Sequence, residues 1–184
     1  METEGNQNQP EQTKSEKKML TGMFADRESA ENAYNSLHER GYSKDDINLI
    51  MSDETRKKHF SDVEETEIGT KAAEGAGKGS AIGGTVGAIV GVVAALGTSL
   101  VIPGLGLLVA GPLAAGLAGA GAGGIAGGVI GALVGSGIPE ERAKIYESGV
   151  KDGRIVMGVN PRNDDDANHI ENSWRENKGE EIYR

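Results

Sequence analysis

The sequence predicts an α+β fold: a ferredoxin-like domain interrupted by a long, apolar, glycine-rich helical hairpin. Three observations support this prediction. Strand and helix patterns alternate at both ends of the chain. Between them lie 61 residues, 79–139, without one charged side chain. Inside this apolar stretch, glycines recur at every fourth residue.

The composition limits the functions that the chain can have. Its 184 residues carry a net charge of -9, which argues against a nucleic-acid partner, because phosphate binding requires a basic surface. The absence of cysteine excludes disulfides, thiolate nucleophiles and thiolate metal ligands. Residues 1–18 are polar and contain no secretory signal, so we expect a disordered tail and a chain that starts in the cytosol.

The first half of the domain is predicted over residues 19–51, in the order β-α-β. Residues 19–24 (MLTGMF) and 47–51 (INLIM) have the composition of strands. Asp26 is placed to cap the helix between them, and Gly41 is placed to end it. The apolar residues of this helix recur on one face: Ala30, Ala33, Tyr34 and Leu37. A charged connector is expected over residues 52–70.

The second half is predicted over residues 139–184, in the order α-β-α-β. A helix over 140–151 presents Ala143, Tyr146 and Val150 on one face, and residues 154–160 alternate as a strand. Asn163 is expected to cap a further helix, with the inner residues Ala167, Ile170 and Trp174. A short final strand is expected over 181–184. Both ends of a hairpin emerge on one side, so the two halves can still pair.

Residues 71–138 are predicted to form the hairpin, with helices over about 70–100 and 112–135. The ten glycines expected to pack these helices form two rows of equal spacing: Gly75, Gly79, Gly83, Gly87 and Gly91, then Gly119, Gly123, Gly127, Gly131 and Gly135. Such a row leaves a groove in which a second helix backbone approaches closely, as in membrane helix pairs. A helix of this length would span the roughly 30 Å hydrocarbon core.

These features predict a transmembrane glycine zipper, with the lipid bilayer and further copies of the chain as partners. The expected location is a bacterial cytoplasmic membrane with both termini in the cytosol. The alternative is a soluble, cytoplasmic protein whose hairpin folds onto its own domain or is buried in a homo-oligomer. In either case the protein partner of the α+β domain is unknown.

No motif in the sequence predicts a catalytic residue, a cofactor, a metal site or a small-molecule substrate. Gly119, Gly121 and Gly124 match the dinucleotide pattern G-x-G-x-x-G, but no predicted strand precedes them. The three histidines lie on separate segments: His38, His59 and His169. Asp164, Asp165 and Asp166 are typical of a solvated helix start, although they could bind a cation. Residues 56–59 (RKKH) could contact anionic lipid or be an ordinary solvated cluster.

Three stretches carry a family resemblance. Residues 21–60 resemble the opening of the bacterial general stress protein family, and residues 102–124 and 131–159 resemble its members with glycine zippers. The most specific part is residues 137–153 (GIPEERAKIYESGVKDG). The resemblance implies a bacterial, membrane-associated, stress-linked protein, and it brings no catalytic residues. The expected function is therefore that of a non-enzymatic stress-response or structural protein in the membrane. The alternative is a soluble oligomeric regulatory or binding module.

Overall fold

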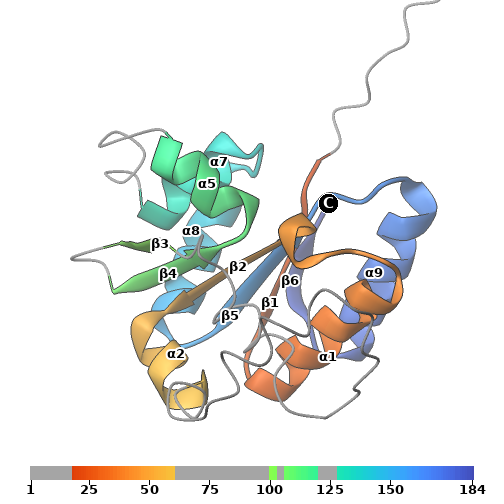
Figure 1. Cartoon of the computed structure of the whole chain (residues 1–184), viewed down its shortest axis with the longest axis horizontal. Coiled ribbons are helices and arrows are strands. Elements are labelled where there is room, and N and C mark those ends of the chain that lie inside the picture. Colours follow the sequence, from red (N-terminus) through yellow and green to blue (C-terminus); the bar gives the residue numbers. More distant parts are fainter. Residues whose placement is uncertain (1–17, 61–99, 103–105, 120–127) are drawn as a thin grey trace, which may run out of the picture.

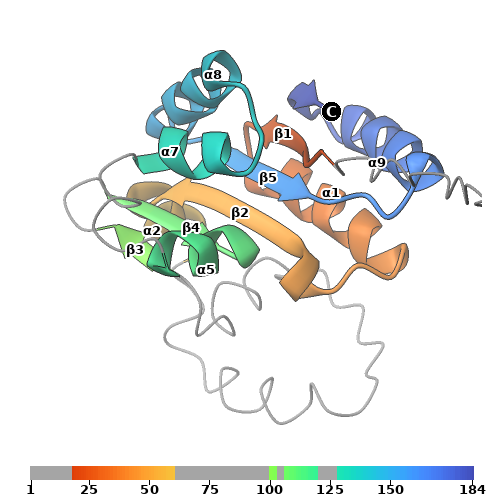
Figure 2. The same ribbon diagram turned by 90° about the horizontal axis from the view of Figure 1, so that it is seen from above.

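The computed structural model describes residues 18–60, 100–102, 106–119 and 128–184. These residues form an α+β fold in which one six-stranded antiparallel sheet has helices on both faces (Figures 1 and 2). The described elements follow the order β1 (Leu20–Phe24), α1 (Arg27–Glu39), η1 (Lys44–Asp46), β2 (Ile47–Ser52), α2 (Asp53–Phe60), β3 (Leu100–Ile102), β4 (Leu107–Ala110), α5 (Pro112–Gly119), α7 (Gly128–Gly135), α8 (Glu140–Lys151), β5 (Ile155–Val159), α9 (Asp164–Glu176) and β6 (Glu180–Tyr183).

The two ends of the chain meet in the middle of the sheet. The strand order is β3-β4-β2-β5-β1-β6, so β5 from the C-terminal half lies between β1 and β2 from the N-terminal half. Leu49 of β2 and Gly22 of β1 both oppose Met157 of β5. The prediction that the two halves pair across the intervening segment is therefore confirmed.

The strands and helices predicted for both halves are also observed, and the two predicted helix caps are confirmed. The Asp26 side chain accepts a hydrogen bond from the Ser29 N–H at 2.8 Å and caps α1. The Asn163 side chain accepts one from the Asp166 N–H at 2.8 Å and caps α9. The buried faces of α1, α8 and α9 contain the apolar residues that the helical spacing selects. The connector expected over 52–70 contains a further helix, α2.

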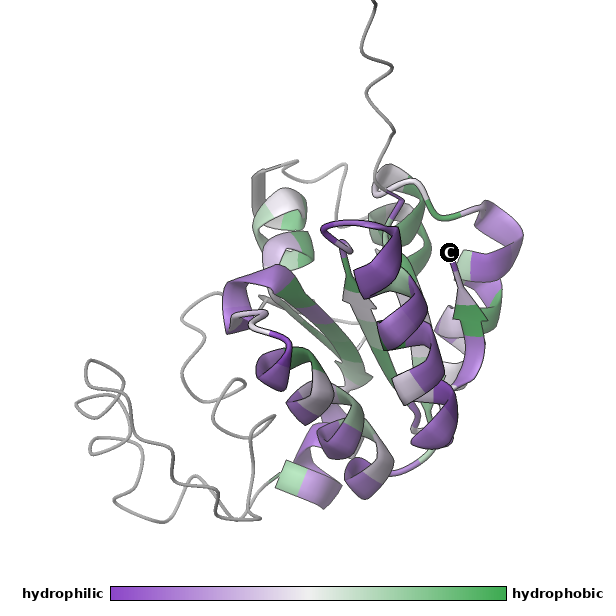
Figure 3. Ribbon diagram, turned by 90° about the vertical axis from the view of Figure 1, so that its right-hand side faces the viewer, coloured by the Kyte–Doolittle hydropathy of each residue, from purple (hydrophilic) through white to green (hydrophobic). Residues whose placement is uncertain are grey.

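One face of the sheet is covered by α1, α2 and α9. Leu20, Phe24 and Met157 point to this side, as the alternation of side chains along a strand requires. They pack against Leu37 of α1 and against Trp174 of α9, whose ring meets the Phe24 ring edge-on at 5.6 Å between centroids. Figure 3 shows the helices of this face as mainly hydrophilic on the outside and the strands behind them as mainly hydrophobic.

The opposite face is covered by α5, α7 and α8 (Figure 2). The alternate strand residues, including Met23, Ile50 and Val156, point to this side. They pack with Leu133 of α7 and Tyr146 of α8. Most residues described between 106 and 135, where a hairpin in lipid was predicted, are thus packed on or within the α+β domain.

The prediction of a transmembrane helical hairpin is wrong. The apolar run expected to join two helices forms β3 and β4, and β4 pairs with β2 inside the sheet. Helices α5 and α7 have eight residues each, or about 12 Å at about 1.5 Å per residue, well short of a hydrocarbon core of about 30 Å. Over the ranges that the structure describes, no helix has both the length and the apolar character to cross a membrane. The predicted location in the cytoplasmic membrane depended on such helices and is overturned with them.

The glycine zipper is corrected as well. Gly119 is the last residue of α5, and Gly131 and Gly135 lie on α7. A Cβ atom added at Gly135 would meet no atom within 4 Å, whereas a zipper glycine touches a neighbouring helix backbone. The other predicted packing residues lie outside the described ranges: Gly75, Gly79, Gly83, Gly87, Gly91, Gly123 and Gly127.

Candidate functional site

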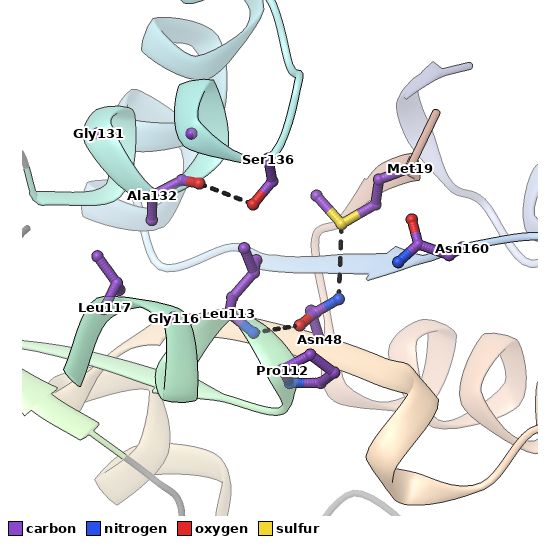
Figure 4. A pocket seen from close by; sticks show the side chains of 11 residues that line it. Met19, Asn48, Pro112, Leu113, Gly116, Leu117, Gly131, Ala132, Ser136 and Asn160 are labelled. Carbon is purple, nitrogen blue, oxygen red and sulfur yellow. Dashed lines mark hydrogen bonds between the residues drawn. The ribbon is translucent and has the colours of Figure 1, made fainter. Parts of the chain in front are cut away.

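A cavity of about 500 Å³ lies between α5, α7 and the sheet (Figure 4). Its lining comes from the start of α5, from α7 and the residue after it, and from residues 19, 48 and 160 on the sheet side. Small-molecule sites in proteins typically enclose about 300–1,000 Å³ and are lined mainly by apolar groups with a few polar ones. The volume of this cavity falls within that range, and several of its lining residues, including Gly116, Gly135 and Asn160, are exposed, so the cavity opens to solvent.

The α5 wall is fixed to the sheet at its first turn. Gly111 has a φ of +91°, and a Cβ atom there would lie 2.2 Å from the carbonyl oxygen of Ile47, so only glycine allows this approach to β2. Pro112 follows at the first helical position, where its missing N–H costs nothing. The side-chain oxygen of Asn48, on β2, accepts the Leu113 N–H at 2.8 Å. Asn48 therefore caps α5 from a neighbouring strand.

The α7 wall is held by the turn that leads to α8. The N–H of Ile138 donates to the carbonyl oxygen of Leu133 at 3.0 Å, and both side chains are buried in the core of this face. The Ser136 hydroxyl donates to the Ala132 carbonyl oxygen at 3.0 Å, which keeps Ser136 against the helix end. Since α8 is anchored by its own buried face, α7 has a defined position opposite α5.

Glycines create the space between the two helices. A Cβ atom added at Gly116 or at Gly135 would meet no atom within 4 Å. Elsewhere in the fold, glycines do the opposite: a Cβ at Gly22 would lie 2.8 Å from the Trp174 ring. Gly116 of α5 and Gly135 of α7 thus border open space, whereas Gly22 permits close packing.

The cavity has a polar end and an apolar end. Figure 4 shows Met19, Asn48, Ser136 and Asn160 toward one side, and Leu117 with Ala132 toward the other. The Asn48 amide nitrogen donates to the Gly158 carbonyl oxygen at 3.3 Å and to the Met19 sulfur at 3.5 Å. The distance to the carbonyl oxygen is slightly long for a hydrogen bond, and a thioether sulfur is a weak acceptor.

The shifted pKa values belong to structural contacts outside the cavity. Burial raises the pKa of Tyr146 to about 12, and its hydroxyl donates to the Glu181 carbonyl oxygen at 2.6 Å and lies 2.9 Å from the Thr21 hydroxyl. Hydrogen bonds from Arg40 and Tyr42 lower the pKa of Asp166. Both groups hold elements together: Tyr146 joins α8 to β1 and β6, and Asp166 joins α9 to the end of α1.

The residues singled out in the sequence do not come together. His38, His59 and His169 lie on α1, α2 and α9 respectively. Within the described ranges, no group of three or more histidine or carboxylate side chains could hold a metal ion. Arg40 pairs with both Asp165 and Asp166, and Arg184 pairs with Asp164, so all three aspartates face a cationic side chain. The G-x-G-x-x-G match begins at Gly119, where a helix ends, and its other two glycines are not described.

The basic cluster of residues 56–59 lies on α2. Asp53, at the start of the same helix, pairs with Arg56 at 3.0 Å and with Lys57 at 2.8 Å. The Arg27 guanidinium donates to the His59 carbonyl oxygen and lies 5.0 Å from the centre of the Phe60 ring. The cluster thus contributes to the attachment of α2 to α1.

Sequence reasoning missed the cavity and most of its lining. The expectation that no small-molecule substrate was evident rested on the lack of a recognised motif. One available signal was Asn48, a polar residue within the apolar strand INLIM, which turns out to be 2% exposed. A buried polar residue in such a strand needs a partner, and here the partner is the start of α5. Gly131 and Gly135 were noticed, but as packing residues.

Comparisons of this chain with protein-family models, with curated proteins and with solved structures find no significant match. The resemblance to the general stress protein family therefore remains an expectation from the sequence. What the chain does has to be argued from the cavity itself.

Proposed function

We propose that this protein is a non-enzymatic binding module and that the cavity between α5 and α7 holds an apolar small molecule. The observation that carries this proposal is the open space at Gly116 and Gly135, on opposite walls of a cavity of about 500 Å³. Several lining residues, including Gly116, Gly135 and Asn160, are exposed, so the cavity is open to solvent and its apolar wall borders water. A ligand that fills the space would remove that apolar wall from water.

The chemistry of the lining favours binding over catalysis. Its side chains are those of Met, Asn, Pro, Leu, Gly, Ala and Ser. Ser136, the one hydroxyl among them, donates to the Ala132 carbonyl oxygen, and no lining residue is a histidine or a carboxylate that could act as its base. Such a lining can orient a ligand, but it offers no general acid or base.

We further propose that the domain is a ferredoxin-like unit with an addition on its bare face. The strand order β2-β5-β1-β6, with α1 and α9 both on one side, supports this assignment. A two-layer unit of this kind leaves one sheet face without helices of its own. In this chain α5, α7 and α8 cover that face, so the addition would supply both the cover and the binding cavity.

Self-association, with a stress-linked role for the assembly, is a second proposal. Val134 on α7 and Ile145 on α8 are large apolar side chains that are 43% and 42% exposed. A second copy would cover them in an oligomeric module. Sedimentation velocity of the protein and of Val134→Lys with Ile145→Lys tests this, since an oligomer should dissociate in the double variant. A monomer at all concentrations would contradict it.

The test of ligand binding uses N-phenyl-1-naphthylamine, an uncharged dye that fluoresces in apolar sites. We expect saturable binding by the full chain. The variants Gly116→Leu and Gly135→Leu place a side chain in the open space and should weaken binding about tenfold or more, which corresponds to about 1.4 kcal/mol. The matched control is Ala115→Leu, because Ala115 is exposed and lies outside the lining.

The test compares the dye affinities of the leucine variants at positions 116 and 135 with that of the control at position 115. Circular dichroism and urea unfolding of each variant show whether it retains the fold. If the leucines at 116, 135 and 115 leave dye affinity equally unchanged, the dye does not occupy this cavity and the proposal fails. It also fails if the protein binds no dye.

A further inference from the structure

The helix start beside the cavity has no free N–H for an anion. Pro112 has no N–H, the Leu113 N–H donates to Asn48 at 2.8 Å, and the Ala114 N–H donates to the Gly111 carbonyl oxygen at 3.0 Å. Anions bind at helix N-termini through such free donors. The first turn of α5 therefore lines the cavity without offering the contacts that a carboxylate or a phosphate needs.

Charge is absent from the whole lining. None of its eleven residues has a charged side chain, and the chain as a whole carries -9. A carboxylate or an ammonium group beside Asn48, which is 2% exposed, would lose part of its hydration without gaining a counter-charge. A neutral head group avoids this cost.

One buried donor at the polar end has a poor partner. The Asn48 side chain is held in one orientation because its oxygen accepts the Leu113 N–H. Its amide nitrogen then points to the Gly158 carbonyl oxygen at 3.3 Å and to the Met19 sulfur at 3.5 Å. Figure 4 shows the contact with Met19. An oxygen atom of a ligand is a better acceptor for the second N–H than the thioether is. The exposed Asn160 lies at the same end and adds a second amide.

We infer that the ligand is a neutral amphiphile, with an apolar body between α5 and α7 and an uncharged hydroxyl or carbonyl oxygen beside Asn48 and Asn160. This inference rests on the proposed binding function and names the ligand class for the same site. The apolar body contacts Leu117 and Ala132. The head-group oxygen accepts the hydrogen bond from the Asn48 amide that otherwise goes to the Met19 sulfur.

The experiment displaces bound N-phenyl-1-naphthylamine from the full chain with 1-octanol, octanoate or octylamine at neutral pH. These three compounds share one apolar chain and differ in the charge of the head group. We expect 1-octanol to displace the dye at concentrations about tenfold or more below those of either ion. Equal displacement by octanoate or octylamine would overturn the inference while leaving apolar binding intact. A chain that binds no dye would overturn the proposed function itself, and this inference with it.

A charge placed at the polar end sharpens the test. Asn160 is exposed, so Asn160→Lys should fold normally and bring a cation to the head-group end. Octanoate should then gain about tenfold in affinity relative to 1-octanol. The control is Ala115→Lys, which adds the same charge to the exposed side of α5, outside the lining. An unchanged ratio in Asn160→Lys, or an equal gain in Ala115→Lys, would show that the head group is not at this end.

Discussion

The two faces of the sheet solve the same packing problem in opposite ways. On the face of α1 and α9, aromatic rings fill the space, and Gly22 exists because the Trp174 ring lies where its side chain would be. On the face of α5 and α7, small residues and short helices leave about 500 Å³ unfilled. The first face is tightly packed, and the second has room for another molecule.

The difference shows that glycine content alone does not identify a structural role. At some glycines an added Cβ atom would clash with a neighbour, so the glycine permits close packing. At others an added Cβ atom would meet no atom, so the glycine leaves open space. Gly22 and Gly111 belong to the first kind, and Gly116 and Gly135 to the second.

The same Leu→Ala substitution should lower the free energy of unfolding by different amounts on the two faces of the sheet. Leu37 is 0% exposed in the packed core, whereas Leu117 borders the existing cavity. Leu→Ala substitutions cost roughly 2–5 kcal/mol, and the cost rises with the volume of the new void and falls where fewer contacts are lost. We expect Leu37→Ala near the upper end of that range and Leu117→Ala near the lower end, measured by urea unfolding. Similar losses would mean that Leu117 is as tightly packed as Leu37.

Glycine-to-alanine substitutions at Gly22 and Gly116 should change the free energy of unfolding in opposite directions. Gly22→Ala forces a Cβ to 2.8 Å from the Trp174 ring, and overpacking of this kind costs about 1–3 kcal/mol. Gly116→Ala meets no atom and raises helix propensity, so it should stabilise the fold by up to about 0.5–1 kcal/mol. Thermal unfolding of both variants measures this. Destabilisation by Gly116→Ala would indicate that the space at Gly116 is not open.

The face covered by α1 and α9 should also make the stability of the fold depend on pH. The pKa of Asp166 is held below its ordinary value of 3.8 by hydrogen bonds from Arg40 and Tyr42. A carboxylate whose pKa is lower in the folded state stabilises the fold above its unfolded pKa, and this contribution is lost as the pH falls through the folded value. Stability should therefore fall below about pH 4, and Asp166→Asn should make that fall smaller.

The readout is the urea midpoint of both proteins between pH 7 and pH 2.5. Asp26 and Asp46 also have lowered pKa values, so the variant should keep part of the dependence. Parallel profiles for the two proteins would contradict a stabilising role of ionised Asp166.

Local signals predicted the packed face well. Caps at Asp26 and Asn163 and the apolar spacings of α1 and α9 are encoded within a few residues, and helices follow from such patterns directly. The pairing of the two halves was predicted from a hairpin that returns the chain to its starting side. The halves do pair, but the segment between them contributes β3 and β4 to the same sheet. The face with the cavity could not be predicted in this way, because a short apolar run is equally compatible with a buried strand and a buried helix.

The misleading signal was the lack of charge over residues 79–139. Residues 107–110 are uncharged because β4 is buried on both sides, between Phe60 and Met51 on one face and Leu113 and Ile50 on the other. Lipid and a protein core favour the same side chains, so composition did not separate them. The candidate site depends on contacts between residues 48 and 113, and no local pattern predicts such a contact.

One face of the sheet contains a cavity with an apolar end that another molecule can fill. Xenon occupies apolar cavities and can be located in pressurised crystals. We expect a xenon peak between α5 and α7, near Leu113, Leu117 and Ala132, and none between α1 and α9. A crystal without xenon at that position, or with protein side chains filling it, would contradict the account.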